Sequence, residues 1–179
     1  MTHAERLLLD YVETPLGRFV LVADEDGRLR AAGWVDSHAR MERQLCAYSA
    51  ERSISLTPNP GGCSAVLRAY FAGDLGAIDR LPVAAGGTDF QRAVWRALRE
   101  IPYGETRSYA ALARHIGHPA AVRAVGLANG SNPIAIVVPC HRVIGSDGSL
   151  TGYGGGLPRK RWLLEHEARQ CTLRPEASA

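Results

Sequence analysis

Residues 88–130 read TDFQRAVWRALREIPYGETRSYAALARHIGHPAAVRAVGLANG and carry the pattern that decides the fold. Thr88 and Gln91 have the spacing of a capping box, and apolar residues then recur at helical spacing until Pro102 and Gly104. These apolar residues are Phe90, Val94, Ala97, Leu98 and Ile101. The pattern predicts a first helix with one buried face.

Two shorter helices are expected after this first one. The second starts near Ser108, ends at Gly117, and has one apolar side formed by Tyr109, Leu112, Ala113 and Ile116. The third begins at Pro119, because proline suits the first helical turn, and runs to Gly130. Two short helices joined by a glycine-containing turn form a helix-turn-helix pattern.

The third helix is built from small residues around one charged side chain, Arg123. The small residues are Ala120, Ala121, Ala124, Gly126 and Ala128. Such a helix can pack tightly against a neighbouring helix. Alternatively, its backbone can approach a DNA groove closely, with Arg123 projecting into the duplex.

The first half of the chain predicts a small sheet followed by helices. Short β-rich runs, broken near Pro15 and at Asp26-Gly27, are typical of an antiparallel meander. Helices are expected near residues 37–50 and 63–72, separated by the loop at 57–62. Gly86-Gly87 marks a boundary, which gives domains at 1–86 and 87–167 and a flexible tail at 168–179.

Composition and charge restrict the class of protein. The chain of 179 residues is 46% hydrophobic and can bury a core, but no apolar run is long enough to cross a bilayer. The N-terminus MTHAERLLLD does not resemble a secretory signal, so a cytoplasmic protein is expected. Residues 1–86 hold nine Arg against eleven acids, whereas residues 87–167 hold ten basic residues against six acids. The basic surplus in the second half points weakly to nucleic acid.

The four cysteines are expected to be free thiols. Cys46, Cys63, Cys140 and Cys171 are widely spaced and form no CxxC pair. This spacing argues against a zinc site and against a disulfide framework. No metal site is therefore predicted.

The segment NPIAIVVPCHRVIG, residues 132–145, carries the clearest chemical signal. Its apolar run at 134–138 is typical of a buried strand or extended segment, and Pro139 ends the run just before Cys140. His141 and Arg142 follow directly, so one neighbour, His141, can take the proton of the thiol and both can stabilise its thiolate. Cys140 is therefore a candidate nucleophile.

Glu167 is the candidate partner for His141. On the final helix, expected at 158–167, Glu167 lies four residues after Leu163 and shares its face. A carboxylate that points inward requires a partner, and His141 is a suitable one. The other interpretation is a solvated glutamate near a helix end.

These motifs together resemble a known family. Residues 132–167 resemble the active-site region of the O6-alkylguanine-DNA alkyltransferases, in which PCHRV contains the acceptor cysteine. FQRAVWRALREIPYGETRSYAALA resembles the preceding helices, and the TPLG turn and LRAYFAGDL resemble the N-terminal domain. The resemblance implies an α+β fold, with a small ribonuclease-H-like sheet-and-helix domain before a mostly helical domain that carries the helix-turn-helix.

The resemblance also implies the roles of the reacting groups. Cys140 would accept the alkyl group, His141 would act as a base through a bound water, and Glu167 would orient His141. Asn132 would make hydrogen bonds that hold the active-site segment in place. The reaction would be an irreversible transfer from O6-alkylguanine in flipped-out DNA, with O4-alkylthymine as a second candidate substrate.

Other residues would bind the base and the leaving group. Tyr109 and Lys160 would assist the departing guanine, and Tyr153 would wall the base pocket. The carbonyl of Val143, with that of Cys140, would accept from the guanine amino group. Gly154 stands where many members have Ser or Ala, and glycine would keep a backbone N–H donor to O6.

For DNA, the resemblance implies that Arg123 fills the gap left by the flipped nucleotide. Ala121, Ala124 and Gly126 would lie against the duplex. The expected partner is therefore double-stranded DNA carrying alkylated guanine. We expect a monomer, with cooperative assembly on DNA as an alternative, and no membrane partner.

Two other classes of function remain open at this point. A non-catalytic lesion sensor or DNA-binding regulator would use the helix-turn-helix alone, but such a relative is expected to lack the acceptor cysteine. A cysteine hydrolase would usually have its histidine far from the cysteine in sequence, whereas His141 follows Cys140 directly. No GxGxxG or P-loop motif is present, and no cofactor is predicted.

Overall fold

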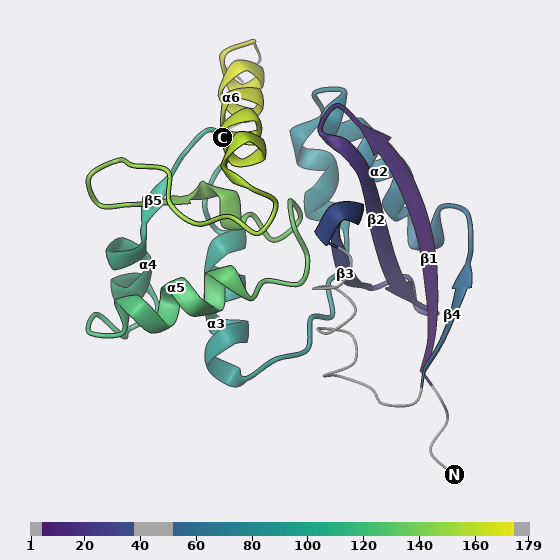
Figure 1. Ribbon diagram of the computed structural model, residues 1–179, viewed down its shortest axis with the longest axis horizontal. Coiled ribbons are helices and arrows are strands. Elements are labelled where there is room, and N and C mark those ends of the chain that lie inside the picture. The colour runs from purple at the N-terminus through teal and green to yellow at the C-terminus, as the bar shows by residue number, and fades with distance from the viewer. Residues whose placement is uncertain (1–4, 38–51, 174–179) are drawn as a thin grey trace. The chain divides into compact units, whose positions relative to one another are not determined.

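The computed structural model describes residues 5–37 and 52–173, which form two compact units (Figure 1). The first unit runs to Gly87 and also includes residues 133–137, and the second comprises residues 88–132 and the chain from Val138 onward. The sequence predicted a single boundary after residue 86. In the structure, residues 133–137 also belong to the first unit.

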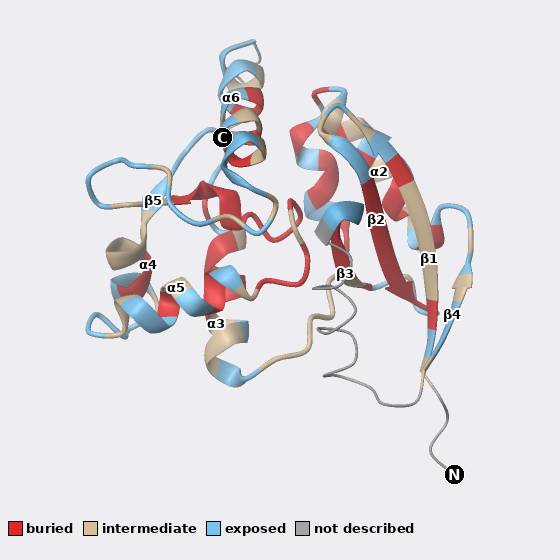
Figure 2. Cartoon of the chain, in the orientation of Figure 1, coloured by how far each residue is buried: buried red, intermediate tan, exposed pale blue. Residues whose placement is uncertain are grey.

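The first unit is built on a four-stranded sheet with the order β3-β2-β1-β4. β1 (Glu5–Thr14), β2 (Gly17–Asp24) and β3 (Leu29–Trp34) pair antiparallel in succession, which confirms the expected meander. β4 (Arg52–Leu56) was not foreseen and runs parallel to β1. Figure 2 shows that β2 is buried along most of its length, so this strand forms the centre of the core.

Helix α2 (Cys63–Phe71) packs against β1 and β2, where a helix was expected. Short 3₁₀ turns lie at Val35–Ser37 (η1), Pro60–Gly62 (η2) and Leu75–Arg80 (η3). Asp10 of β1 ties the loop before α2 to the sheet, because its Oδ2 accepts hydrogen bonds from Ser64 Oγ at 2.5 Å and Asn59 N at 2.9 Å. The helix predicted near 37–50, with Cys46, lies outside the described residues except for Ser37.

The second unit contains the expected helices. Its elements are α3 (Asp89–Arg99), β5 (Arg107–Ser108), α4 (Tyr109–His115), α5 (Val122–Gly130), η4 (Cys140–Arg142), β6 (Val143–Ile144) and α6 (Leu157–Leu173). The capping box of Thr88 and Gln91 is present, and Ser108 Oγ caps α4 by accepting from Ala111 N. β5 pairs parallel with β6, which places the start of α4 beside the segment that follows Cys140.

Two predicted boundaries are corrected. α5 begins at Val122 rather than Pro119, because a hydrogen bond from Ala121 N to His118 O closes a separate turn first. α6 continues to Leu173, past the end expected at Glu167, and residues 174–179 lie outside the described part of the chain. No helix within residues 5–37 and 52–173 is both long and apolar enough to cross a membrane.

The apolar run at 134–138 is buried but is not an extended strand. Only Ile134 makes a β-bridge, to Ala32. A hydrogen bond of 2.9 Å from Val137 N to Ala135 O then closes a tight turn around Ile136, whose φ is 72°. A β-branched residue rarely adopts a positive φ. Burial of the Ile136 side chain therefore stabilises a backbone conformation that isoleucine would otherwise avoid.

The close approach of Gly27 and Gly61 gives a stability prediction for the first unit. Gly61 has φ +57°, and a Cβ there would lie 2.6 Å from both Cα and O of Gly27. Gly61→Ala should therefore lower the free energy of unfolding by more than the about 1–2 kcal/mol that a left-handed backbone costs alanine.

Gly62→Ala is the matched control, because Gly62 has φ +78° but open space around its Cβ position. Urea unfolding of the two variants would measure both losses. Equal losses would show that the two backbones can move apart freely.

Candidate active site

Cys140 is presented by a tight turn at Pro139. Pro139 has φ −82° and ψ 64°, and Cys140 N donates to Val138 O at 2.8 Å, which is the geometry of an inverse γ-turn. Asn132 Nδ2 donates to the same carbonyl of Val138 at 2.7 Å, as expected of a residue that holds this segment. The thiol thus sits on a short, doubly anchored turn, and Cys140 is 7% exposed.

His141 and Glu167 form a fully buried pair. His141 Nε2 lies 2.9 Å from Glu167 Oε1, and both side chains are 0% exposed. The inward-pointing interpretation of Glu167 is therefore correct, because α6 turns Lys160, Leu163 and Glu167 to the same buried side. His141 Nδ1 is buried and has no hydrogen-bond partner in the described part of the chain.

Electrostatics make His141 a neutral base. Burial lowers the pKa of His141, and the charge and hydrogen bond of Glu167 only partly oppose this shift, while Arg142 and Lys160 add to it. Burial alone would raise the pKa of Glu167, but His141 and Arg142 hold it well below its usual range. With Glu167 ionised, Nε2 carries the proton and Nδ1 is left as an acceptor.

Arg142 has a partner that the sequence did not suggest. We expected it to help the thiolate, but its Nε and Nη2 donate to Glu167 Oε2 and Oε1, each at 2.9 Å. A guanidinium fork matches the two oxygens of a carboxylate closely. Sequence reasoning therefore missed Glu167 as the partner of Arg142, because it considered only the neighbouring Cys140.

Lys160 is buried at 0% exposure beneath two backbone carbonyls. Its Nζ donates to Val143 O at 2.6 Å and Thr151 O at 2.7 Å. Burial lowers the pKa of Lys160, and the charge of the Cys140 thiolate opposes that shift. The half-buried Tyr109 hydroxyl donates to the same Thr151 carbonyl at 3.4 Å. Lys160, Tyr109 and Val143 are thus brought together around one loop.

Tyr153 and Gly154 lie in the loop that precedes α6. The Tyr153 ring is centred 6.5 Å from the ring of His141 and meets it edge-on. Gly156 N donates to Tyr153 O at 2.9 Å, which closes the glycine run into a turn with Gly154 on its exposed side. The structure thus places Tyr153 beside His141 and Gly154 at the surface.

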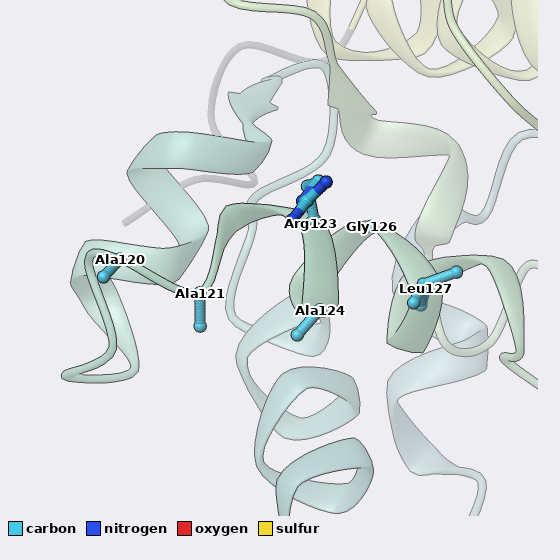
Figure 3. Close-up of a pocket in the computed structure, with 6 residues that line it drawn as sticks. All are labelled: Ala120, Ala121, Arg123, Ala124, Gly126 and Leu127. Atoms are coloured by element: carbon cyan, nitrogen blue, oxygen red, sulfur yellow. The ribbon is translucent and has the colours of Figure 1, made fainter.

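Helix α5 has one buried side and one bare side. Val125, Ala128 and Asn129 are buried, and Trp95 Nε1 of α3 donates to Ala128 O at 2.9 Å. An open groove lines the other side, formed by Ala120, Ala121, Arg123, Ala124, Gly126 and Leu127 (Figure 3). Arg123 and Ala124 point to different sides of the helix in this view.

The small residues of α5 therefore serve two purposes. The packing interpretation is right for the buried Ala128, but Ala120 and Ala124 are exposed. A Cβ on Gly126 would meet only Tyr109 Cδ1, at an ordinary contact distance of 3.9 Å. Sequence reasoning overlooked Leu127, which is 76% exposed in the middle of this surface.

Among the described residues, no group of three or more His, Cys, Asp or Glu side chains is arranged to hold a metal ion. Of the cysteines, Cys63, Cys140 and Cys171 are free thiols. Burial raises the pKa of Cys63 and of Cys171, and the charge of Glu167 adds to the shift at Cys171.

Fold and site together define an α+β protein with a small sheet domain and a helical domain, in which a buried cysteine is followed directly by a buried His-Glu pair. Family models match both parts: 6-O-methylguanine DNA methyltransferase, ribonuclease-like domain, over residues 7–85, and DNA binding domain, over residues 89–169. The chain therefore belongs to the 6-O-methylguanine DNA methyltransferase family.

Individual relatives agree with this assignment. A methylated-DNA–protein-cysteine methyltransferase of Shigella flexneri is 54% identical over 165 residues, covering 90% of this chain and 96% of the relative. One from Mycobacterium bovis is 52% identical over 159 residues, covering 87% and 89%. The crystal structure of Mycobacterium tuberculosis OGT in complex with DNA matches with a TM-score of 0.77 and 44% identity, covering 92% of this chain and 94% of that chain.

The site geometry predicts the protonation state of His141. In the resting protein, its ring should be neutral, with the proton on Nε2, at and below the ordinary histidine pKa of about 6.5. Glu167→Gln should lower the pKa of His141 further, because the attraction of the carboxylate is lost while Arg142 and Lys160 remain. Nitrogen NMR of the labelled imidazole would report both states, and a proton on Nδ1 near neutral pH would contradict the assignment.

Proposed function

We propose that this protein repairs DNA by transferring an alkyl group from O6 of a damaged guanine to its own Cys140. The observation that carries the proposal is the buried pair of His141 and Glu167 directly after Cys140, in which the acceptor nitrogen of His141 has no hydrogen-bond partner among the described residues. A DNA-binding regulator has no use for such an arrangement. The family membership and the bare surface of α5 supply the DNA context.

This arrangement supports thiol activation. A water between Cys140 and His141 Nδ1 would carry the thiol proton to the imidazole, and Glu167 would stabilise the resulting imidazolium. The thiolate then attacks the alkyl carbon, the bond between that carbon and O6 breaks, and the electron pair moves into the purine. A carbon–sulfur bond replaces a carbon–oxygen bond, and guanine regains a proton.

Stabilising the departing guanine is the role we assign to the loop around Lys160. Negative charge grows on the purine as the bond breaks, so donors near O6 and N3 favour the transition state. The Gly154 N–H would donate to O6 and the Tyr109 hydroxyl would donate to N3. The Val143 carbonyl, held by Lys160 and joined by the Cys140 carbonyl, would accept from the guanine amino group, and Tyr153 would wall the pocket.

The bare surface of α5 would bind the duplex. The O6 group is not accessible to in-line attack within the base stack, so the nucleotide must be extruded. Ala121, Ala124 and Gly126 would allow the helix backbone to approach the groove, and Arg123 would fill the space that the extruded nucleotide leaves.

The reaction would consume the protein. Transfer leaves a thioether, and a thiolate is a poor leaving group from an unactivated alkyl carbon. Thiol exchange, which recycles disulfides, cannot break a carbon–sulfur bond. A cysteine that must stay reduced until this single event suits a reducing compartment, which is why we place the protein in the cytoplasm.

The first functional prediction concerns Cys140 and stoichiometry. With excess O6-methylguanine duplex, product should rise to one equivalent of protein and stop, and intact mass should increase by one methyl group on the Cys140 peptide. Cys140→Ser should abolish transfer and keep DNA binding, because an alcohol is a far poorer nucleophile than a thiol paired with a base.

Cys63→Ser is the matched control and should transfer normally, since Cys63 lies in the first unit, whereas Cys140 lies in the second. Binding of damaged DNA by the wild-type protein without any gain in mass would favour a lesion sensor. Continued turnover would show a true catalyst.

The second functional prediction separates extrusion from chemistry. Arg123→Ala should slow repair of duplex DNA far more than reaction with the free base O6-benzylguanine, which needs no extrusion. Rates on the two substrates can be compared in one protein preparation. Equal losses on both would assign Arg123 to the chemical step instead.

A further inference from the structure

We propose that Arg142 is a positioning residue for the transfer reaction, acting through Glu167 to set the tautomer and basicity of His141. This inference rests on the proposed function. It concerns a residue that does not contact the substrate in the proposed mechanism.

The guanidinium of Arg142 contacts three partners: a carboxylate, a backbone carbonyl and an aromatic ring. Beyond the two hydrogen bonds to Glu167, its Nη1 donates to Ile101 O at 2.6 Å. Its guanidinium carbon lies 4.3 Å from the centre of the Tyr103 ring, a distance at which cation and ring attract. Arg142 is only 3% exposed. This combination fixes the guanidinium plane, and therefore fixes the plane of the carboxylate that it binds.

Glu167 Oε1 is the atom that Arg142 and His141 share. Arg142 Nη2 and His141 Nε2 both lie 2.9 Å from it. A guanidinium cannot accept a hydrogen bond and does not lose its proton, so the carboxylate between the two groups remains ionised. His141 must then donate from Nε2. The choice of Nδ1 as the acceptor for the thiol proton is thus made by the Arg142–Glu167 pair.

Arg142 also restrains the basicity of His141. A histidine paired with a carboxylate alone would be a stronger base. The positive charge of Arg142 counters this effect by repelling a second charge on the ring and by sharing the negative charge of Glu167. A base that is unprotonated at neutral pH can accept the thiol proton without first losing one.

The ionisable groups that face this network come from four segments of the second unit. They are Tyr103, Cys140, His141, Arg142, Tyr153, Lys160, Glu167 and Cys171. Lys160 also lowers the pKa of His141, so removal of Arg142 would leave a smaller, residual restraint.

The test is the pH profile of single-turnover transfer to the full-length protein from O6-benzylguanine, which does not depend on DNA binding. In Arg142→Met, the pKa of His141 should rise, and the acid limb of the profile should move up by about one pH unit. Below the limb, the rate should therefore fall about tenfold relative to wild type. Active-site titration would correct each rate for the fraction of protein that can react.

Arg142→Lys is the conservative variant. It retains the charge, so its acid limb should remain near that of wild type, but it loses the fork geometry, so its maximal rate should fall. Arg169→Met is the matched control, because Arg169 is exposed on the same helix as Glu167, and its profile should be unchanged.

A uniform loss of rate at every pH in Arg142→Met would overturn the proposal and leave Arg142 with a role in stability alone. If Arg142→Met does not fold, Arg142→Lys decides the matter, since an unchanged rate across the whole pH range would equally overturn it. Failure of the wild-type protein to gain an alkyl group would contradict the proposed function rather than this inference.

Discussion

The buried carboxylate of Glu167 is the constraint around which the second unit is organised. A carboxylate removed from water is strongly destabilising unless it is both paired and hydrogen-bonded. Glu167 receives one hydrogen bond from His141 and two from Arg142, so its requirement is met by two consecutive residues of the turn that carries Cys140. The orientation of α6, the conformation of the turn and the chemistry of the thiol are therefore aspects of one interaction.

The proposed DNA recognition requires an exposed surface rather than a buried one, and the same unit contains such a surface. In the proposed reaction, the reacting groups need burial because exclusion of water strengthens their electrostatic interactions, whereas the proposed DNA-binding surface must be bare. Helix α5 is anchored on one side by Val125, Ala128 and the hydrogen bond from Trp95. Its other side carries side chains too small to cover the backbone, except Arg123 and Leu127. One short helix can therefore be fixed in place and still approach another molecule closely.

The sequence predicted what is local and overlooked what is distant. The capping box at Thr88, the cap at Ser108 and the inward direction of Glu167 follow from spacing along one helix, and the structure contains all three. Strand β4 pairs with β1, which is distant in sequence, and no local pattern reports such a partner. The partner of Arg142 was hidden for a related reason. Adjacency to Cys140 suggested only the thiolate, whereas the guanidinium of Arg142 binds a carboxylate 25 positions further along the chain.

The two buried cations of the site show why side-chain shape matters as much as charge. The chain contains twenty Arg and one Lys, and the lysine lies where two carbonyls converge on a single point, at 2.6 and 2.7 Å from Nζ. A compact ammonium can donate to both carbonyls, whereas a planar fork would separate them. Arg142 faces a carboxylate, whose two oxygens match the fork. Exchange of the two residues would preserve the net charge and leave both sets of acceptors poorly matched. The site therefore depends on the geometry of each cation, and charge alone would not specify it.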